Sequence, residues 1–431
     1  MALKVFKFGG ASVKDAARIQ NVTDILQKYK GESLVIVVSA MGKTTNALEA
    51  VTQAYFKQTG EAATLMEAVK QQHYLLMTEL FGSEEHEVFA EVNDLFVEAD
   101  WVLEVPPEDS YDYIYDQIVS LGELVSTKIL AAYLQEHGLP TQWIDARDII
   151  LTDDIYREGW VQWEETQARA DRIVKPLLGQ GEFIITQGFI GSTSENNTTT
   201  LGREGSDYSA AIFSYCLDAE SMSIWKDVPG VLTGDPRLFD NVTKLDELSY
   251  REAIEMTYYG ASVIHPKTIK PLQNKSIPLY VKSFINPAGK GTMIAADVDD
   301  NYPPMVAIES NQALLNISTR DFSFVAEQHI SDLFHQITAH RLHVNMMQNS
   351  AINFRICVTD QDDKVEDFSK AIEHTFKIST EANLELITVR HYNEQTLQDL
   401  RLGKIILTEN RIKNTVQMVA KTVPAMKRKR E

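Results

Sequence analysis

The chain has 431 residues, of which 44% are apolar and 24% are charged, and 61 acidic against 41 basic side chains give it a net charge of −20. This length is typical of two or three domains with a substantial core. The acidic balance argues against nucleic acid or an anionic membrane as the main partner, since both are bound through basic surfaces. No apolar leader and no run of about 18 apolar residues occurs, so we expect a cytoplasmic, unanchored protein.

The first 300 residues alternate between strand-like and helix-like segments. Apolar runs with the length of buried parallel strands occur at 3–8, 33–39, 182–186 and 221–225. Helical spacing follows the first run, with Ser12 as the expected N-cap and Asp15 completing a capping box. A long helix is expected over 113–138, ending at a glycine. This alternation predicts an α/β fold, an αβα sandwich with a mostly parallel central sheet, which binds ligands at the carboxyl ends of its strands.

Residues 286–304 are rich in Gly, Pro and Asp and lose all periodicity, which marks the expected domain boundary. We therefore expect one domain over 1–300 and a second over 305–431. The second begins with strand, helix, strand, strand, helix and strand at 313–318, 325–339, 342–347, 352–358, 364–376 and 384–390. This βαββαβ order is typical of a ferredoxin-like domain.

Glycines or small polar residues connect an expected strand to an expected helix at 7–12, 39–46, 187–193 and 201–207. Glycine lets the backbone approach a ligand closely, and the free amides at a helix N-terminus favour anions. Four such bends in one α/β domain favour an anionic ligand. The "GKT" at 42–44 resembles the end of a P-loop, but Val37 stands where the first glycine should be, so a P-loop is excluded.

Charged residues accompany these bends. Lys7 could supply the positive charge that phosphoryl transfer needs, and Arg203 offers a fork suited to a carboxylate. Asp207 either favours the dipole of its helix or organises Lys7 or a Mg²⁺ ion, and Glu123 is either a solvated residue or part of a site. A nucleotide could lie beside Lys226, Asp227 and Arg237, although a plain surface loop would explain their turns equally well. Side chains with the spacing of metal ligands are not found.

Six segments resemble the aspartokinases of the amino-acid kinase superfamily, and they occur in the order of that family. They are "KFGGAS" (7–12), "SLGELVST" (120–127), "TTTLGREGSDYSAA" (198–211), "KDVPGVLTGDPR" (226–237), "YGASVIHPKTIKPL" (259–272) and "INPAGKGTMI" (285–294). Residues 314–351 resemble the ACT domain of the same enzymes. The resemblance implies the amino-acid kinase fold followed by an ACT domain. It also implies transfer of the γ-phosphoryl group of ATP to the side chain of L-aspartate with Mg²⁺, the first step towards lysine, threonine and methionine.

The resemblance also implies roles for individual residues. The phosphates of ATP would be held by Lys7, Phe8, Gly9 and Gly10, and the rest of ATP would be bordered by Lys226, Asp227, Arg237, Ser262 and Val263. Aspartate would be held by Thr45, Glu123, Arg203, Glu204, Gly205 and Ser206. Glu123 would pair with the ammonium group and Arg203 with a carboxylate, while Asp207 would orient the catalytic Lys7.

The chain departs from its family at several points. Many relatives have glycine at the position of Glu204, some have tyrosine at that of Leu232, and many have lysine at that of Ser262. Relatives also carry two ACT units, whereas one complete unit and a strand-like remnant at 415–420 are recognisable here.

The resemblance implies a homodimer joined through the ACT domains, with lysine or threonine as an effector near Asn345 and Ser350. A dimerisation module without a ligand stays open. Two other functions also stay open, a kinase for glutamate or acetylglutamate and an amino-acid sensor without catalysis. From the length, we expect no fused homoserine dehydrogenase.

Overall fold

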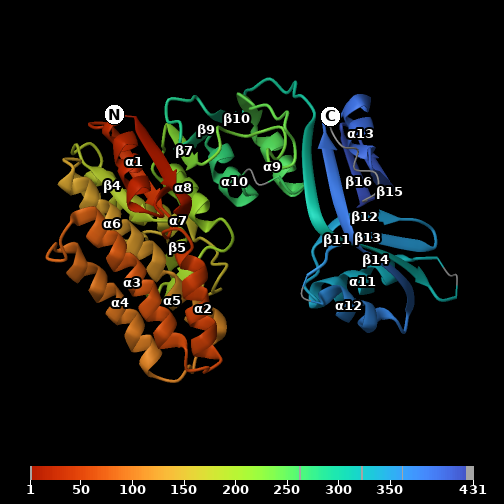
Figure 1. The fold of residues 1–431 in the computed structure, drawn as a ribbon, viewed down its shortest axis with the longest axis horizontal. Helices are drawn as coiled ribbons and strands as arrows, with labels where there is room; N and C mark the ends of the chain where they lie inside the picture. The colour runs from red at the N-terminus through yellow and green to blue at the C-terminus, as the bar shows by residue number, and fades with distance from the viewer. Residues whose placement is uncertain (1, 262–263, 322–323, 362, 424–431) are drawn as a thin grey trace. The chain divides into compact units, whose positions relative to one another are not determined.

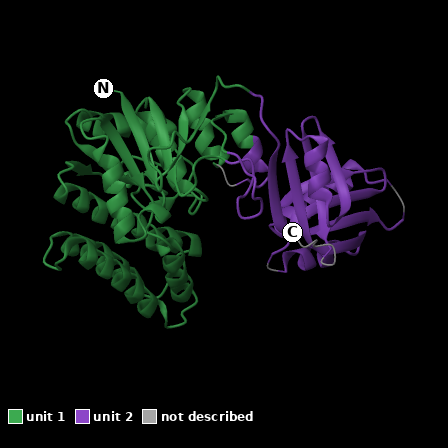
Figure 2. Cartoon of the chain, turned by 45° about the horizontal axis from the view of Figure 1, so that its top comes forward, with its two compact units in different colours: residues 1–231, 244–254, 264–299 green, residues 232–243, 255–263, 300–431 purple. Residues whose placement is uncertain are grey.

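The computed structural model describes residues 2–261, 264–321, 324–361 and 363–423, in two compact units (Figure 2). The first unit comprises 1–231, 244–254 and 264–299, and the second comprises 232–243, 255–263 and 300–431. Two segments that we expected in the first domain, 232–243 and 255–263, therefore group with the second unit. One reason is that the Val306 amide donates a hydrogen bond to the Thr233 carbonyl (2.8 Å), and Phe239 packs against the core of the second unit.

The described part of the first unit contains an eight-stranded sheet in the order β3-β4-β2-β1-β7-β9-β10-β8 (Figure 1). Four of its strands are the expected ones, β1 (Leu3–Phe8), β2 (Ser33–Val38), β4 (Phe183–Gln187) and β7 (Ser221–Lys226). The others are β3 (Thr141–Trp143), β8 (Glu247–Ser249), β9 (Leu279–Ser283) and β10 (Thr292–Ala295). Every pairing is parallel except that of β9 with β10, which confirms the mostly parallel sheet.

Helices follow the strands along the chain. They are α1 (Ala16–Gln27), α2 (Thr44–Phe56), α3 (Ala62–Phe81), α4 (Val88–Glu104), α5 (Tyr111–Val119), α6 (Leu121–Glu136), α7 (Trp163–Ile173), α8 (Gly205–Cys216), α9 (Tyr250–Tyr258) and α10 (Pro266–Asn274). A small hairpin joins β5 (Ile190–Ser192) to β6 (Thr198–Thr200). Among the described residues, no helix combines the length and the apolar character that crossing a bilayer requires.

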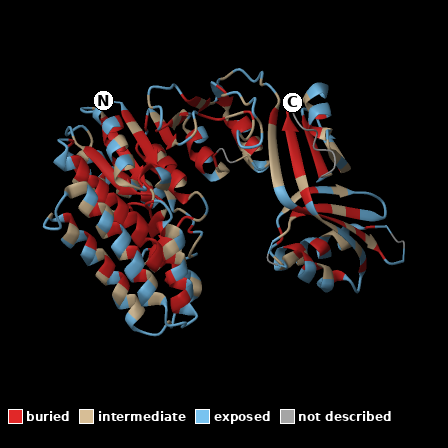
Figure 3. Ribbon diagram, in the orientation of Figure 1, coloured by how far each residue is buried: buried red, intermediate tan, exposed pale blue. Residues whose placement is uncertain are grey.

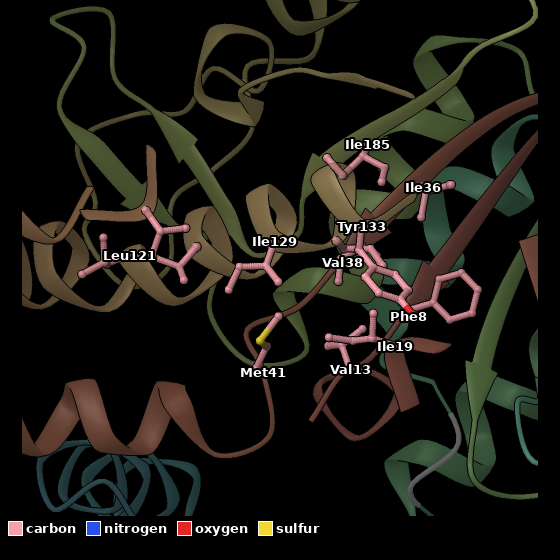
Figure 4. Close-up of a cluster of buried hydrophobic side chains, with 14 of the residues drawn as sticks. Phe8, Val13, Ile19, Ile36, Val38, Met41, Leu121, Ile129, Tyr133 and Ile185 are labelled. Atoms are coloured by element: carbon pink, nitrogen blue, oxygen red, sulfur yellow. The ribbon is translucent and has the colours of Figure 1, made fainter. Parts of the chain in front are cut away.

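The core of the first unit lies between the sheet and the helices that cover it. Phe8 and Val38 of the sheet meet Ile19 of α1 and Ile129 of α6 in one buried cluster (Figure 4). Successive side chains of a strand point to opposite faces, so Val5 points away from this cluster. On the second face α8 packs against β1, β2 and β7. The central strands β1, β2 and β4 are buried on both faces, whereas α3 and α4 are exposed along one side (Figure 3).

Two local expectations are wrong. The helix expected over 113–138 is divided at Ser120, whose hydroxyl donates to the Gln117 carbonyl (3.2 Å), so that Glu123 lies in the first turn of α6. The N-cap of α1 is Asp15, whose carboxylate accepts the Arg18 amide (2.9 Å). Ser12 instead ends a short 3₁₀ turn and donates to the Trp225 carbonyl (3.4 Å).

From residue 305 onwards, the second unit has the expected βαββαβ order. Its elements are β11 (Met305–Thr319), α11 (Glu327–Ala339), β12 (Val344–Asn349), β13 (Asn353–Thr359), α12 (Lys364–Ile372) and β14 (Phe376–Arg390), followed by α13 (Glu394–Arg401), β15 (Lys404–Ile412) and β16 (Thr415–Thr422). The strand order β12-β13-β11-β14 is ferredoxin-like and continues into β16 and β15. Strands β11 and β14 are longer than expected and begin before residues 313 and 384. A bulge near Asn311 and Asn383, whose backbones are both in the left-handed region, interrupts the alternation of apolar and polar residues along them.

This sheet is folded over on itself. Its two end strands meet where the Gln348 side chain of β12 donates to the Glu409 carbonyl of β15 (3.0 Å) and accepts the Thr408 hydroxyl (2.7 Å). A buried cluster that includes Leu314 and Val419 fills the inside. Helices α11 and α12 pack against one half of the outer face, and α13 packs against the other half.

Candidate active site

The bends at 7–12 and 39–46 are packed directly against each other. A Cβ atom built on Gly10 would lie 2.6 Å from the Ala40 carbonyl oxygen, closer than any side chain allows. The Gly42 amide donates a hydrogen bond to the Gly10 carbonyl (3.0 Å), and Gly42 has a φ of +55°. Glycine at position 10 is therefore required by the close approach of two backbones, at the carboxyl ends of β1 and β2.

The bends at 187–193 and 201–207 are packed in the same way. A Cβ atom built on Gly188 would lie 2.5 Å from Cβ of Ser206, and one built on Gly205 would lie 2.6 Å from the Phe189 ring. Phe189 has a φ of +73°, a strained conformation for a bulky residue, and its amide donates to the Ser209 hydroxyl (2.9 Å). The second pair of bends thus surrounds the N-terminus of α8.

An ion pair joins the two pairs of bends. The Lys7 ammonium lies 2.7 Å from Oδ1 of Asp207, and the side chains are only 11% and 5% exposed. Burial alone would raise the pKa of Asp207, but the positive charges of Lys7 and Lys226 outweigh it, so the pKa lies below its usual value. Asp207 is therefore ionised near neutral pH and holds Lys7 in place.

Glu123 is a buried carboxylate with a free oxygen. Its side chain reaches the bend at 39–46, where Oε1 accepts the Ala40 amide (3.3 Å), whereas Oε2 has no hydrogen-bond partner among the described residues. Burial raises the pKa of Glu123 to about 8, although the Ala40 hydrogen bond and the Lys7 charge lower it. A buried, unpaired oxygen of this kind is suited to a cationic group of a ligand. Thr45 lies in the first turn of α2, on the same bend as Ala40, and is half-buried.

The residues before α8 differ in their surroundings. Arg203 is exposed and forms no ion pair with any described residue, so its guanidinium is available to a ligand. Glu204 has a φ of +55°, which explains why glycine suits this position, and its Oε2 accepts the His265 amide (2.9 Å) at the start of α10. Glu204 thus pairs with the backbone and not with Arg203. Gly205 and Ser206 begin α8 and are buried.

The expected nucleotide residues are only partly brought together. Lys226 ends β7 beside Asp227, which is exposed, and Gly9 lies next to the Lys7 ammonium. The Phe8 side chain is fully buried in the core (Figure 4), so that only its backbone can face a ligand.

The three other expected nucleotide residues are not among the described residues of the first unit. Arg237 belongs to the second unit, as Leu232 does, and pairs with Asp235 (2.6 Å). Ser262 and Val263 lie outside the described residues. Over the ranges that the structure describes, no group of three or more His, Cys, Asp or Glu side chains is placed to hold a metal ion.

One buried carboxylate that supports the site was missed by the sequence analysis. Asp116 of α5 is fully buried and accepts hydrogen bonds from the Thr200 hydroxyl (2.7 Å), the Thr200 amide (2.8 Å) and the Arg157 amide (2.9 Å). Burial raises its pKa to about 6 despite these bonds. Asp116 thereby fixes the end of β6, immediately before the bend that carries Arg203. The available signal was a lone carboxylate within the apolar stretch 114–119.

Comparisons with a family model and with curated proteins point to the same family. The amino acid kinase family matches residues 2–283. The chain is 31% identical over 352 residues to the lysine-sensitive aspartokinase 3 of Escherichia coli (strain K12), covering 81% of this chain and 76% of that protein. It is 30% identical over 393 residues to the bifunctional aspartokinase/homoserine dehydrogenase 2 of Arabidopsis thaliana, and it spans only 42% of that longer protein.

Solved structures agree over nearly the whole chain. Escherichia coli aspartokinase III in complex with lysine and aspartate superposes with a TM-score of 0.82 at 25% identity, covering 97% of this chain and 95% of that one. The same enzyme in complex with aspartate and ADP gives a TM-score of 0.80 at 25% identity, with 97% and 96% covered.

Proposed function

Since the chain belongs to the amino acid kinase family and, within it, to the aspartokinases, we propose that it transfers the γ-phosphoryl group of ATP to the side-chain carboxylate of L-aspartate, giving 4-phospho-L-aspartate. The observation that carries the proposal is the buried Lys7–Asp207 pair close to the unpaired Glu123. This arrangement offers positive charge to a phosphoryl group and a buried carboxyl oxygen to an ammonium group within one set of bends.

Aspartate has one ammonium group and two carboxylates. The free oxygen of Glu123 accepts the ammonium group, and the exposed Arg203 fork binds a carboxylate through two parallel hydrogen bonds. Thr45, Gly205 and Ser206 complete this subsite through the first amides of α2 and α8. Glu204 contributes indirectly, since its side chain is already bonded to the His265 amide.

ATP lies at the carboxyl ends of β1 and β7. Lys7 and the backbone of Phe8, Gly9 and Gly10 face its phosphates, and Lys226 and Asp227 border the rest of the nucleotide. Mg²⁺ binds mainly through phosphate oxygens and needs only one or two carboxylates, and Asp207 and Asp227 are suitable ones. When bound, the ion neutralises charge on the phosphates.

The chemistry requires orientation and electrostatics more than proton transfer. The attacking carboxylate of aspartate is ionised at neutral pH, so no general base is needed. Charge that develops on the transferred group is stabilised by the Lys7 ammonium. Asp207 holds this ammonium at a fixed place.

We further propose that the first unit is catalytic and that the second is an ACT-type module for dimerisation and regulation. Escherichia coli aspartokinase III has been solved with lysine, which favours lysine over threonine as an effector. The Asn345 amide already donates to the Gln312 (2.7 Å) and Thr359 (2.9 Å) side chains, and the Ser350 hydroxyl bonds to Asn353 (3.1 Å). An effector at these positions would have to exchange with those partners, so a module that only dimerises stays the alternative.

ATP turnover with aspartate, glutamate and acetylglutamate tests the activity, with the acyl phosphate trapped by hydroxylamine. Product with aspartate alone supports the proposal. Product with glutamate or acetylglutamate would assign another kinase of the family, and a folded protein without product would assign an amino-acid sensor. Addition of lysine or threonine to the same assay tests the effector, and light scattering tests the dimer.

A further inference from the structure

A cavity of about 530 Å³ lies in the first unit, and none of the described residues assigned to the proposed active site lines it. It is bounded by the loop before α7, by α7 itself, by α8 and by α10. Aromatic rings form its walls. The ring of Trp163 lies edge-on to that of Tyr215, with centroids 5.0 Å apart, and to that of Tyr208, at 6.4 Å. Such a lining is typical of pockets for small molecules.

The fourth aromatic side chain of the lining is exposed on a well-defined loop. Trp160 is 72% exposed, which is unusual for a residue of its size. Its backbone is nevertheless held at both ends, because the Trp160 amide donates to the Asp153 carboxylate (2.9 Å) and the Asp153 amide donates to the Trp160 carbonyl (3.1 Å). The loop therefore places a large apolar ring at this cavity without help from any ligand.

Polar groups give the cavity a positive character. Lys267 and Lys270, one turn apart on α10, are exposed and form no ion pair with any residue that the structure describes. Glu158 is the only carboxylate of the lining. The Tyr208 hydroxyl has no hydrogen-bond partner within the described chain, and burial raises its pKa to about 12, so it remains a donor at neutral pH. Two ammonium groups against one carboxylate stand out in a chain with a net charge of −20.

We propose that this cavity is a second binding site, and that it takes a small planar aromatic carboxylate. The ring of the ligand stacks among the aromatic walls, and its carboxylate meets Lys267, Lys270 and the Tyr208 hydroxyl. An aromatic cation would face two like charges. A neutral aromatic molecule would fill the same walls but could not offer the lysines an opposite charge.

The test is calorimetric titration of the full chain with three ligands of equal size: naphthoate, naphthamide and naphthylmethylammonium. Naphthoate is expected to bind about tenfold more tightly than the amide, and the cation more weakly than both, as charge-assisted hydrogen bonds predict. Saturating aspartate should not displace naphthoate. Because binding is measured and not turnover, the result is independent of the kinase activity.

Variants locate the site. Tyr208→Phe keeps the ring and removes the hydroxyl, and the double variant Lys267→Gln/Lys270→Gln removes both charges. Each should weaken the binding of naphthoate about fivefold or more and that of naphthamide less, since the neutral amide carbonyl accepts weaker hydrogen bonds. Lys57→Gln, at the exposed end of α2, should change the binding of neither ligand. Equal affinity for the three ligands, no saturable binding, or variants that bind as the parent does would overturn the proposal. Self-association that Trp160→Ser abolishes, without naphthoate binding, would also overturn it and would make this face an interface between copies.

Discussion

The Lys7 ammonium and the Asp207 carboxylate form a buried ion pair at 2.7 Å, between the end of β1 and the first turn of α8. Each group is costly to bury alone, so each depends on the other. The pair therefore ties the geometry of the proposed phosphoryl site to the stability of the first unit.

Breaking this pair should lower both the catalytic rate and the stability of the first unit. Lys7→Met and Asp207→Asn are each expected to lower kcat by about two to four orders of magnitude. Each should also lower the free energy of unfolding by about 3–5 kcal/mol, because one charge is left buried without its partner. The double variant should lose less stability than the two single losses added together. The measurements are the hydroxylamine assay and urea unfolding, with Lys28→Met, at the exposed C-terminal cap of α1, as the control. Strictly additive losses would contradict the coupling.

Glu123 should make stability depend on pH. Its pKa is raised to about 8 in the folded protein, so stability from this group is lost progressively as pH rises from the unfolded pKa, 4.5, towards 8. Glu123→Gln keeps an oxygen for the Ala40 amide and cannot ionise. It should therefore raise the free energy of unfolding by about 2–4 kcal/mol near pH 8 and by little near pH 5, since each pKa unit is worth about 1.4 kcal/mol. Denaturant unfolding at both pH values checks this, and a difference that is independent of pH would refute it.

Aspartate binding should release a proton from the same residue. Near pH 7 Glu123 is mostly protonated in the free protein, because its pKa is about 8. A bound ammonium group would favour the ionised form and lower that pKa. Titration calorimetry in phosphate and in Tris, whose ionisation enthalpies differ, should show up to one proton released per aspartate. Glu123→Gln should abolish the difference between the buffers, and its persistence in that variant would assign the proton elsewhere.

Arg203 should matter for affinity more than for folding. Arg203→Lys keeps the charge but loses the planar fork, so we expect the KM for aspartate to rise about tenfold or more with an unchanged melting temperature. Arg172→Lys, at the exposed end of α7, is the matched control and should behave as the parent does. An unchanged KM for aspartate would remove Arg203 from the substrate site.

The conformation of Glu204 predicts an unusual order of stabilities. Glu204→Ala and Glu204→Gly both lose the hydrogen bond to the His265 amide, but only alanine keeps a side chain at a φ of +55°. The glycine variant should therefore be more stable than the alanine variant by about 1 kcal/mol, the reverse of the usual order within helices. Thermal unfolding of the two variants compares them directly. Greater stability of the alanine variant would show that this backbone conformation is relaxed.

Local pattern was sufficient for much of the fold. The apolar runs of β1, β2, β4 and β7 and the βαββαβ order of the second unit follow from residue periodicity and turn residues, which act over a few neighbours. The four bends were recognisable for the same reason, because glycine and a following helix start are local features. Segment order then identified the family.

Contacts between distant segments were decided only by tertiary structure. The buried Asp116 that holds β6 and the regrouping of 232–243 with the second unit join residues far apart in sequence. The pairing of Lys7 with Asp207 is also of this kind, and before the fold was known only the family resemblance favoured it over a simple helix-dipole role for Asp207. The folding of the second sheet over on itself also depends on such a long-range contact, the hydrogen bond from Gln348 to β15. Periodicity describes which face of an element is buried but not what that face meets. Partner choice and the resulting pKa shifts depend on packing and burial, which exist only once the chain is folded.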